Sequence, residues 1–210
     1  GVDFKTVLQE AQDLGYAEAD PTADVEGFDA LYKLVILIAL IFQKEIPFDQ
    51  VSRQVITALK SCDFEYARRF GSSIKLAALA ERTEEGIAAE VSPVLFSNKN
   101  PLSNVHGVLN AVLLVGKYNT VGNFLSGEGA GRFPTAAAIA SNVIDIAQGG
   151  HSLSYSLEPS SPLSFKNRSY YLRFFVKDCS GIVGKIGTLF GKYGISLDAV
   201  DQIRGQEGNI

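Results

Sequence analysis

The sequence predicts an α+β fold in which helices cover a mostly antiparallel sheet, followed by a smaller, partial βαβ unit. Three observations support this prediction. Helical spacing of apolar residues fills the first third of the chain, β-like apolar runs separated by short turns fill the middle, and an alanine-rich helical pattern follows them. Helices grouped before strands, with a further helix to cover the strands, are typical of the α+β class.

The helices of the first third are bounded by turn signals. The first helix ends at Gly15, which suits a helix C-cap, and the last ends at Gly71. Asp20 and Pro21 mark a turn ahead of the second and most apolar helix. The helices are expected at residues 3–14, 28–43, 48–59 and 63–70.

Four β-like runs follow, joined by short connections that favour antiparallel pairing. A charged turn at residues 82–86 separates the first two runs, and residues 116–119 form a hairpin between the last two. A glycine-rich loop at residues 127–131 then leads through Pro134 into a helix at residues 135–148. The strands are expected at residues 74–81, 87–95, 110–115 and 120–125.

Periodicity stops after this helix and resumes in a short C-terminal stretch. Residues 149–167 contain Gly, Ser and Pro without apolar periodicity, which predicts a linker. Beyond the linker, alternation predicts a strand at 170–176, helical spacing predicts a helix at 182–193, and a second strand is expected at 195–203. The C-terminal stretch therefore predicts a strand–helix–strand unit.

Composition and charge exclude several classes of function. The 210 residues carry a net charge of −4, so no basic field is expected to hold nucleic acid or an anionic membrane. The two cysteines and two histidines lack metal-site spacing, so we expect no metal site, and sparse thiols fit the reducing cytoplasm. The longest apolar run, Leu34–Phe42, is far shorter than the roughly 20 residues of a membrane span.

An acidic stretch precedes the most apolar helix. It has no lysine or arginine, which leaves two interpretations open: a solvated turn, or a site for a cationic group. A calcium loop is disfavoured because the spacing of the oxygens is irregular and Pro21 interrupts it. Asp29 and Lys33 lie four residues apart on the following helix, where they can form an ion pair. The carboxylates are Glu18, Asp20, Asp24, Glu26 and Asp29.

The stretch from Ala11 to Lys33 resembles the signature of homoserine dehydrogenases. The match is long and keeps its register, which makes chance a poor explanation. The family pattern also runs through the predicted strands. There Lys75 and Asn110 fit either an approach to the site or, the interpretation we favour, polar residues at strand edges, and we interpret His106 as structural. The matching signature residues are Ala11, Gly15, Tyr16, Ala17, Asp20, Pro21, Asp24, Val25, Gly27, Asp29 and Lys33.

The resemblance implies a role for individual residues. Glu18 and Asp29 match the carboxylates that hold homoserine in the family, and Asp24 matches a further acidic residue of that site. Lys33 matches the lysine assigned as proton donor and acceptor, a role that oxidation of an alcohol requires. The apolar helix that follows predicts that Lys33 lies at the edge of a dry site.

The resemblance also implies contacts with a nicotinamide cofactor, NAD or NADP. Gly15 matches a backbone position beside the nicotinamide, and Gly131 matches a glycine that contacts the cofactor. From the residues alone, the loop at 127–131 fits equally a tight turn and a backbone approaching a ligand at a helix N-terminus. Because no GxGxxG lies in a strand–turn–helix setting, we expect the nucleotide-binding domain to precede this chain.

The activity implied by the resemblance is the interconversion of L-homoserine and L-aspartate 4-semialdehyde. This reaction belongs to the biosynthesis of threonine, methionine and isoleucine, and the family's sheet pairs with a second subunit, which implies a homodimer. The alternative is a non-catalytic amino-acid-binding regulatory fragment. A nucleotide-binding domain in the same polypeptide would distinguish the two.

The C-terminal stretch resembles the opening of an ACT regulatory domain, a ferredoxin-like fold of which only one βαβ unit is present. In the family such a domain commonly senses an amino-acid effector. Ser180 stands where a proline is usual, which makes the loop less rigid. The expected organisation is a catalytic and dimerisation domain at 1–149, a linker at 150–168 and a partial ACT domain at 169–210.

Overall fold

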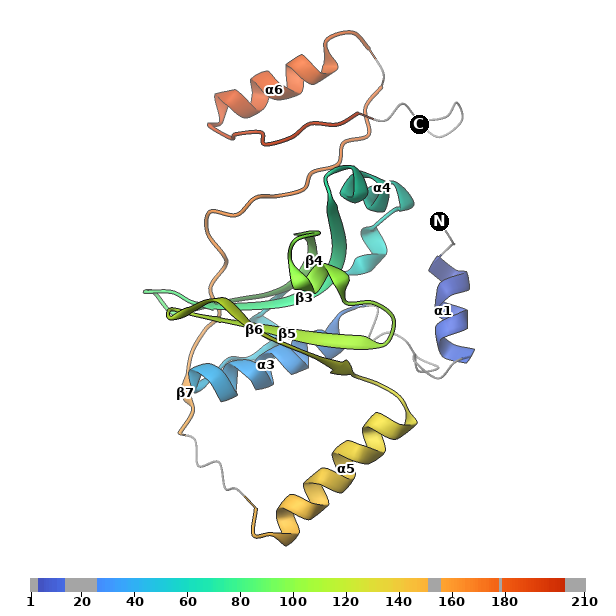
Figure 1. Cartoon of the computed structure of the whole chain (residues 1–210). Helices are drawn as coiled ribbons and strands as arrows, with labels where there is room; N and C mark the ends of the chain where they lie inside the picture. The colour runs from blue at the N-terminus through green and yellow to red at the C-terminus, as the bar shows by residue number, and fades with distance from the viewer. Residues whose placement is uncertain (1–3, 14–25, 151–155, 178, 203–210) are drawn as a thin grey trace. The chain divides into compact units, whose positions relative to one another are not determined.

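The structure is a computed structural model that describes residues 4–13, 26–150, 156–177 and 179–202. The chain divides into two compact units, Gly1–Arg168 and Ser169–Ile210. The elements of the first unit (Figure 1) are α1 (Phe4–Asp13), α3 (Phe28–Phe42), β1 (Lys44–Glu45), the 3-10 turn η1 (Phe48–Gln50), β2 (Ser52–Arg53), the 3-10 turn η2 (Ile56–Ala58), α4 (Ser61–Arg69), β3 (Ser72–Arg82), β4 (Ile87–Ser97), the 3-10 turn η3 (Pro101–Asn104), β5 (Leu109–Gly116), β6 (Asn119–Glu128), α5 (Arg132–Ala147) and β7 (Glu158–Pro159).

Two antiparallel hairpins dominate the first unit. Strands β3 and β4 pair along their whole length, from Ser72 opposite Ser97 to Arg82 opposite Ile87, and β2 adds in parallel to the other edge of β4. Strands β5 and β6 form a separate pair. The long ribbons of both hairpins are visible in Figure 1.

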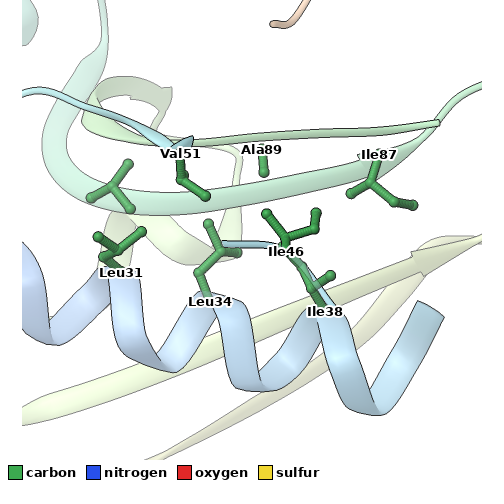
Figure 2. Packing of buried hydrophobic residues seen from close by; sticks show 8 residues of the cluster. Leu31, Leu34, Ile38, Ile46, Val51, Ile87 and Ala89 are labelled. Carbon is green, nitrogen blue, oxygen red and sulfur yellow. The ribbon is translucent and has the colours of Figure 1, made fainter. Parts of the chain in front are cut away.

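The hydrophobic core lies between α3 and the β3–β4 hairpin. Leu31, Leu34 and Ile38 project from one side of α3 toward the strands (Figure 2). Each of these side chains contributes roughly 1.5–3 kcal/mol by leaving water. The other members of the core are Ile46, Val51, Ile87, Ala89 and Val91, the last three at alternate positions of one strand face.

Residues 156–168, here named the strap, return along the first unit after α5. The Glu158 N–H donates to the Gln43 carbonyl (3.2 Å), and the Ser160 N–H donates to the Glu45 carbonyl (2.9 Å). These bonds form the short parallel pair of β1 and β7 directly after the end of α3. The strap therefore holds the C-terminal end of α3.

The second half of the strap closes the free edge of β4. Leu163 donates to the Ile87 carbonyl (2.8 Å) and accepts from the Ala89 N–H (3.1 Å), so it continues the line of β2 along that edge. The strap ends at Arg168, whose guanidinium lies 2.6 Å from a carboxylate oxygen of Glu90. The stretch that the sequence marks as a linker thus packs against the first unit at several points.

The α+β class is confirmed, and most predicted elements of the first unit are present with ends shifted by a few residues. The helix predicted at 48–59 is wrong. The segment forms two 3-10 turns around β2, because Val51 is buried in the core and the backbone of Ser52 and Arg53 pairs with β4 instead of bonding within a helix.

The second unit contains α6 (Ile182–Lys192), as predicted. The centre of the Phe190 ring on this helix lies 6.2 Å from the centre of the Phe174 ring. The strands predicted at 170–176 and 195–203 are not formed in the part of this unit that the structure describes, which ends at residue 202. Alternating side chains alone do not make a strand, since a strand also needs a neighbouring backbone for its hydrogen bonds.

Candidate active site

The predicted ion pair on α3 is confirmed. Lys33 Nζ lies 2.7 Å from Asp29 Oδ2, one helical turn away, with side chains 54% and 49% exposed. Asp29 lies in the first turn of the helix, where the helix dipole favours a carboxylate. The pair thus joins an anion at the helix start to an ammonium group one turn later.

The described residues of this single chain leave Lys33 half exposed, and the expectation that it lies at the edge of a dry site stays a prediction. Successive residues of a helix turn by about 100°, so positions 29 and 33 lie within about 40° of each other, and Leu31, Leu34 and Ile38 lie on the opposite side. The same exposed face continues along α3 with Ile36 and Leu40. The face that carries Lys33 is therefore open, bordered by apolar side chains.

The start of α3 is held by Arg53, which the sequence prediction did not include, and by the packing of Gly27. Arg53 of β2 donates a hydrogen bond to the Glu26 carbonyl, and its guanidinium lies 3.8 Å from the centre of the Phe28 ring. Gly27 is buried with a φ of 76°, and a Cβ there would lie 3.5 Å from Val91. These contacts fix where the helix begins and so where Asp29 and Lys33 lie.

Gly131 belongs to a different element, the start of α5. It is the N-cap of that helix with a φ of 121°, its carbonyl accepts a hydrogen bond from the Thr135 N–H (3.2 Å), and no side chain caps the helix. The backbone ladder of the β5–β6 hairpin reaches toward this loop, because the Gly129 N–H donates to the Val108 carbonyl (3.2 Å). A shallow depression beside the loop is lined by Asn110, Gly127 and Gly129 among others.

Lys75, near the N-terminal end of β3, lies beside His106. Lys75 Nζ donates to the Val105 carbonyl (2.6 Å) and lies 3.4 Å from His106 Nδ1. The ammonium thus ties β3 to the segment that follows η3. This contact supports a structural role for both side chains.

A second depression lies at the far end of α3, away from Lys33, where its lining includes Lys44, Arg82 and Glu158. Lys44 donates a hydrogen bond to the Glu158 carboxylate. This bond, with the charge of the ammonium, holds the pKa of Glu158 below its ordinary value of 4.5. Because the ion pair joins the strap to β1, we interpret this depression as a result of how the strap packs and not as a binding site.

Three predicted site residues, Gly15, Glu18 and Asp24, lie outside the residues that the structure describes. Within the described ranges, no cluster of three or more His, Cys, Asp or Glu side chains could hold a metal ion. No helix there is both long and apolar enough to cross a membrane.

Comparison with known sequences identifies relatives for nearly the whole chain. The family model of homoserine dehydrogenase matches residues 1–144. Homoserine dehydrogenase of Pseudomonas aeruginosa is 37% identical over 221 residues, covering 99% of this chain and 50% of that protein. The Synechocystis enzyme is also 37% identical, covering 99% of this chain and 52% of that protein. The chain thus spans about half the length of these curated relatives.

Solved structures show the same relationship. A homoserine dehydrogenase from Thiobacillus denitrificans matches 96% of this chain and 49% of its own, with a TM-score of 0.77 and 33% identity. The S. aureus homoserine dehydrogenase at pH 7.0 matches 75% of this chain and 40% of its own, with a TM-score of 0.65 and 33% identity.

Proposed function

This chain belongs to the homoserine dehydrogenase family, and from that premise we propose that it supplies the substrate side of an oxidoreductase. The reaction is the interconversion of L-homoserine and L-aspartate 4-semialdehyde, in the biosynthesis of threonine, methionine and isoleucine, with NAD or NADP as cofactor. The observation that carries the proposal is the Asp29–Lys33 pair within the signature stretch, on the open face of α3. The proposed setting is the cytoplasm.

The proposed proton chemistry uses Lys33. When the alcohol is oxidised, the hydroxyl proton must leave, and a lysine amine within hydrogen-bond reach accepts it; in the reverse direction the ammonium returns it. Asp29 orients the Lys33 side chain through the 2.7 Å contact and, with Glu18 and Asp24, holds the substrate by charge and hydrogen bonds.

The residues around Gly131 fit a dinucleotide. No side chain caps the first N–H groups of α5, so these backbone groups can face a ligand there. In this proposal Gly131 and Gly15 contact the cofactor, whose nicotinamide accepts the hydride during alcohol oxidation. Most of its binding site would lie in a nucleotide-binding domain.

We also propose a homodimer and a regulatory role for the second unit. The β5–β6 hairpin leaves Leu125 and Val121 largely exposed, which supports a second copy on the sheet. The relatives' match extends through the C-terminal unit, which supports an ACT-type segment that binds an amino-acid effector.

The proposal is tested by substituting Lys33 in the full-length native protein. We expect Lys33→Ala to lower kcat for homoserine oxidation by about 10²–10⁴-fold, the range for loss of a general acid–base group. Lys33→Arg keeps the positive charge beside Asp29 but does not release its proton, so we expect a comparable loss.

Lys44→Ala is the matched control, because Lys44 is another lysine of the same unit whose partner is Glu158, and we expect near-normal turnover. Wild-type kcat in Lys33→Arg would show that Lys33 does not transfer the proton. Homoserine binding without any coenzyme reduction by the wild-type protein would favour the regulatory alternative.

A further inference from the structure

Asn110 and Gly129 form a close contact beside the loop that leads to Gly131. A Cβ added at Gly129 would overlap the Asn110 Nδ2 and would lie 3.2 Å from the Asn110 Cβ. The carboxamide therefore packs directly on the bare backbone of Gly129. Any larger residue at this position requires the carboxamide to move away.

This contact lies at the point where the β5–β6 ladder ends. Asn110 is opposite Gly127 in the strand register, and the Gly129 N–H makes the next bond beyond the strands, to the Val108 carbonyl (3.2 Å). Past Gly129 the backbone turns to Gly131 and enters α5. The carboxamide thus covers the last residue that the ladder holds before the loop.

We infer that Asn110 is a positioning residue, which clamps Gly129 and so fixes the backbone that presents Gly131 to the nicotinamide cofactor. The inference rests on the proposed function for its catalytic consequence, but the clamp itself can be measured without any activity. Asn110 acts through the loop and is not a catalytic residue.

The backbone at Gly129 makes a steric test possible. Its φ lies outside the left-handed region, so an alanine is tolerated by the backbone and acts only through its added methyl group, which displaces the carboxamide. Gly127, two residues earlier at the end of β6, is the matched control: its φ also lies outside that region, and an added Cβ meets nothing within 4 Å. Asn123, an exposed asparagine on β6, is the control for Asn110.

The first measurement is backbone hydrogen exchange of residues 127–131 in the full-length native protein. We expect faster exchange in Gly129→Ala and in Asn110→Ala, and wild-type exchange in Gly127→Ala and Asn123→Ala. Unchanged exchange in the first two variants would overturn the clamp, whatever the protein catalyses.

The second measurement is steady-state kinetics with NADP and NAD. We expect the cofactor KM to rise roughly tenfold in Gly129→Ala and Asn110→Ala, because a misplacement of about 1 Å can lower the catalytic rate by up to ~10²-fold. The homoserine KM and Tm should change little. Because the two residues are halves of one contact, the double variant should match the worse single variant. Multiplying effects, or an equal loss in Gly127→Ala, would overturn the inference. A wild-type protein without homoserine-dependent reduction would instead overturn the proposed function, and exchange would still decide the clamp.

Discussion

Helix α3 and the β5–β6 hairpin both carry many apolar side chains, but they use them differently. Three large residues of α3 are buried against the β3–β4 hairpin, and its start and end are held by Arg53 and by the strap. No residue of β5, β6 or α5 is buried, and Leu125 is 61% exposed.

The difference separates what this chain positions by itself from what it presents to others. The Asp29–Lys33 pair lies on a helix whose opposite face is fully packed, so its location follows from the first unit alone. The loop at Gly131 follows strands whose apolar side chains stay uncovered in the single chain. A site that combines α3 with the loop at Gly131 is therefore complete only where another domain or subunit covers the β5–β6 hairpin.

The largest expected effect comes from truncating the packed face. Leu34 is 4% exposed, so Leu34→Ala should lower the free energy of unfolding by about 2–5 kcal/mol, through lost burial and a cavity. Leu125→Ala, with the same chemical change on the hairpin, should cost less than about 0.5 kcal/mol at concentrations where the protein is monomeric. Denaturant unfolding measures both. Equal losses would break the comparison between the two regions.

A smaller effect is expected at the start of α3. Arg53→Met keeps much of the aliphatic stem and removes the contacts with Glu26 and with the Phe28 ring, so we expect a loss of roughly 1–2 kcal/mol. Exchange of the Leu31 N–H, which donates to the Gly27 carbonyl (3.1 Å), should quicken most.

The matched control is Arg69→Met. Its ion pair with Glu65 is an exposed pair one turn apart on α4, which contributes at most about 0.5 kcal/mol. If Arg69→Met cost as much as Arg53→Met, the start of α3 would not be held by Arg53 in particular.

The smallest expected effect is a pH dependence at the strap. The pKa of Glu158 is lower in the folded protein, so its bond to Lys44 stabilises the fold above pH 4.5 and this contribution is lost as pH falls through the lowered pKa. Glu158→Gln should therefore unfold slightly more easily than wild type near pH 7, and the two should converge in acid. A gap that widened below pH 4.5 would contradict this sign.

Local spacing was enough to predict some features and not others. The Asp29–Lys33 pair was predictable because both partners lie on one helix, four residues apart. Arg53 was not, since its partner Glu26 is 27 positions away and nothing in the local pattern links them. The segment around Val51 reads as helical, but its conformation is decided by an open strand edge that only the folded β4 provides.

The strap shows the same limit from the other side. Its sequence is polar and aperiodic, which is typical of linkers, but its hydrogen bonds are made by backbone groups that every sequence carries. The prediction of the C-terminal strands is wrong for the opposite reason. Their alternation is clear, but no partner strand is formed in the described residues. In the sequence Gly129 is one of several loop glycines, and its contact with Asn110 is evident only in the structure.

The strap also has a consequence for the order in which the chain folds during synthesis. Lys44 and Glu158 are 114 positions apart, so the edge of β4 and the end of α3 are complete only after nearly the whole first unit has left the ribosome. Until then β4 presents unpaired N–H and C=O groups at Ile87 and Ala89 to neighbouring chains, as strand edges do in aggregation. A first unit cut at residue 149, where the sequence predicts its end, would keep that edge open permanently, so the practical C-terminal boundary of this unit is Arg168.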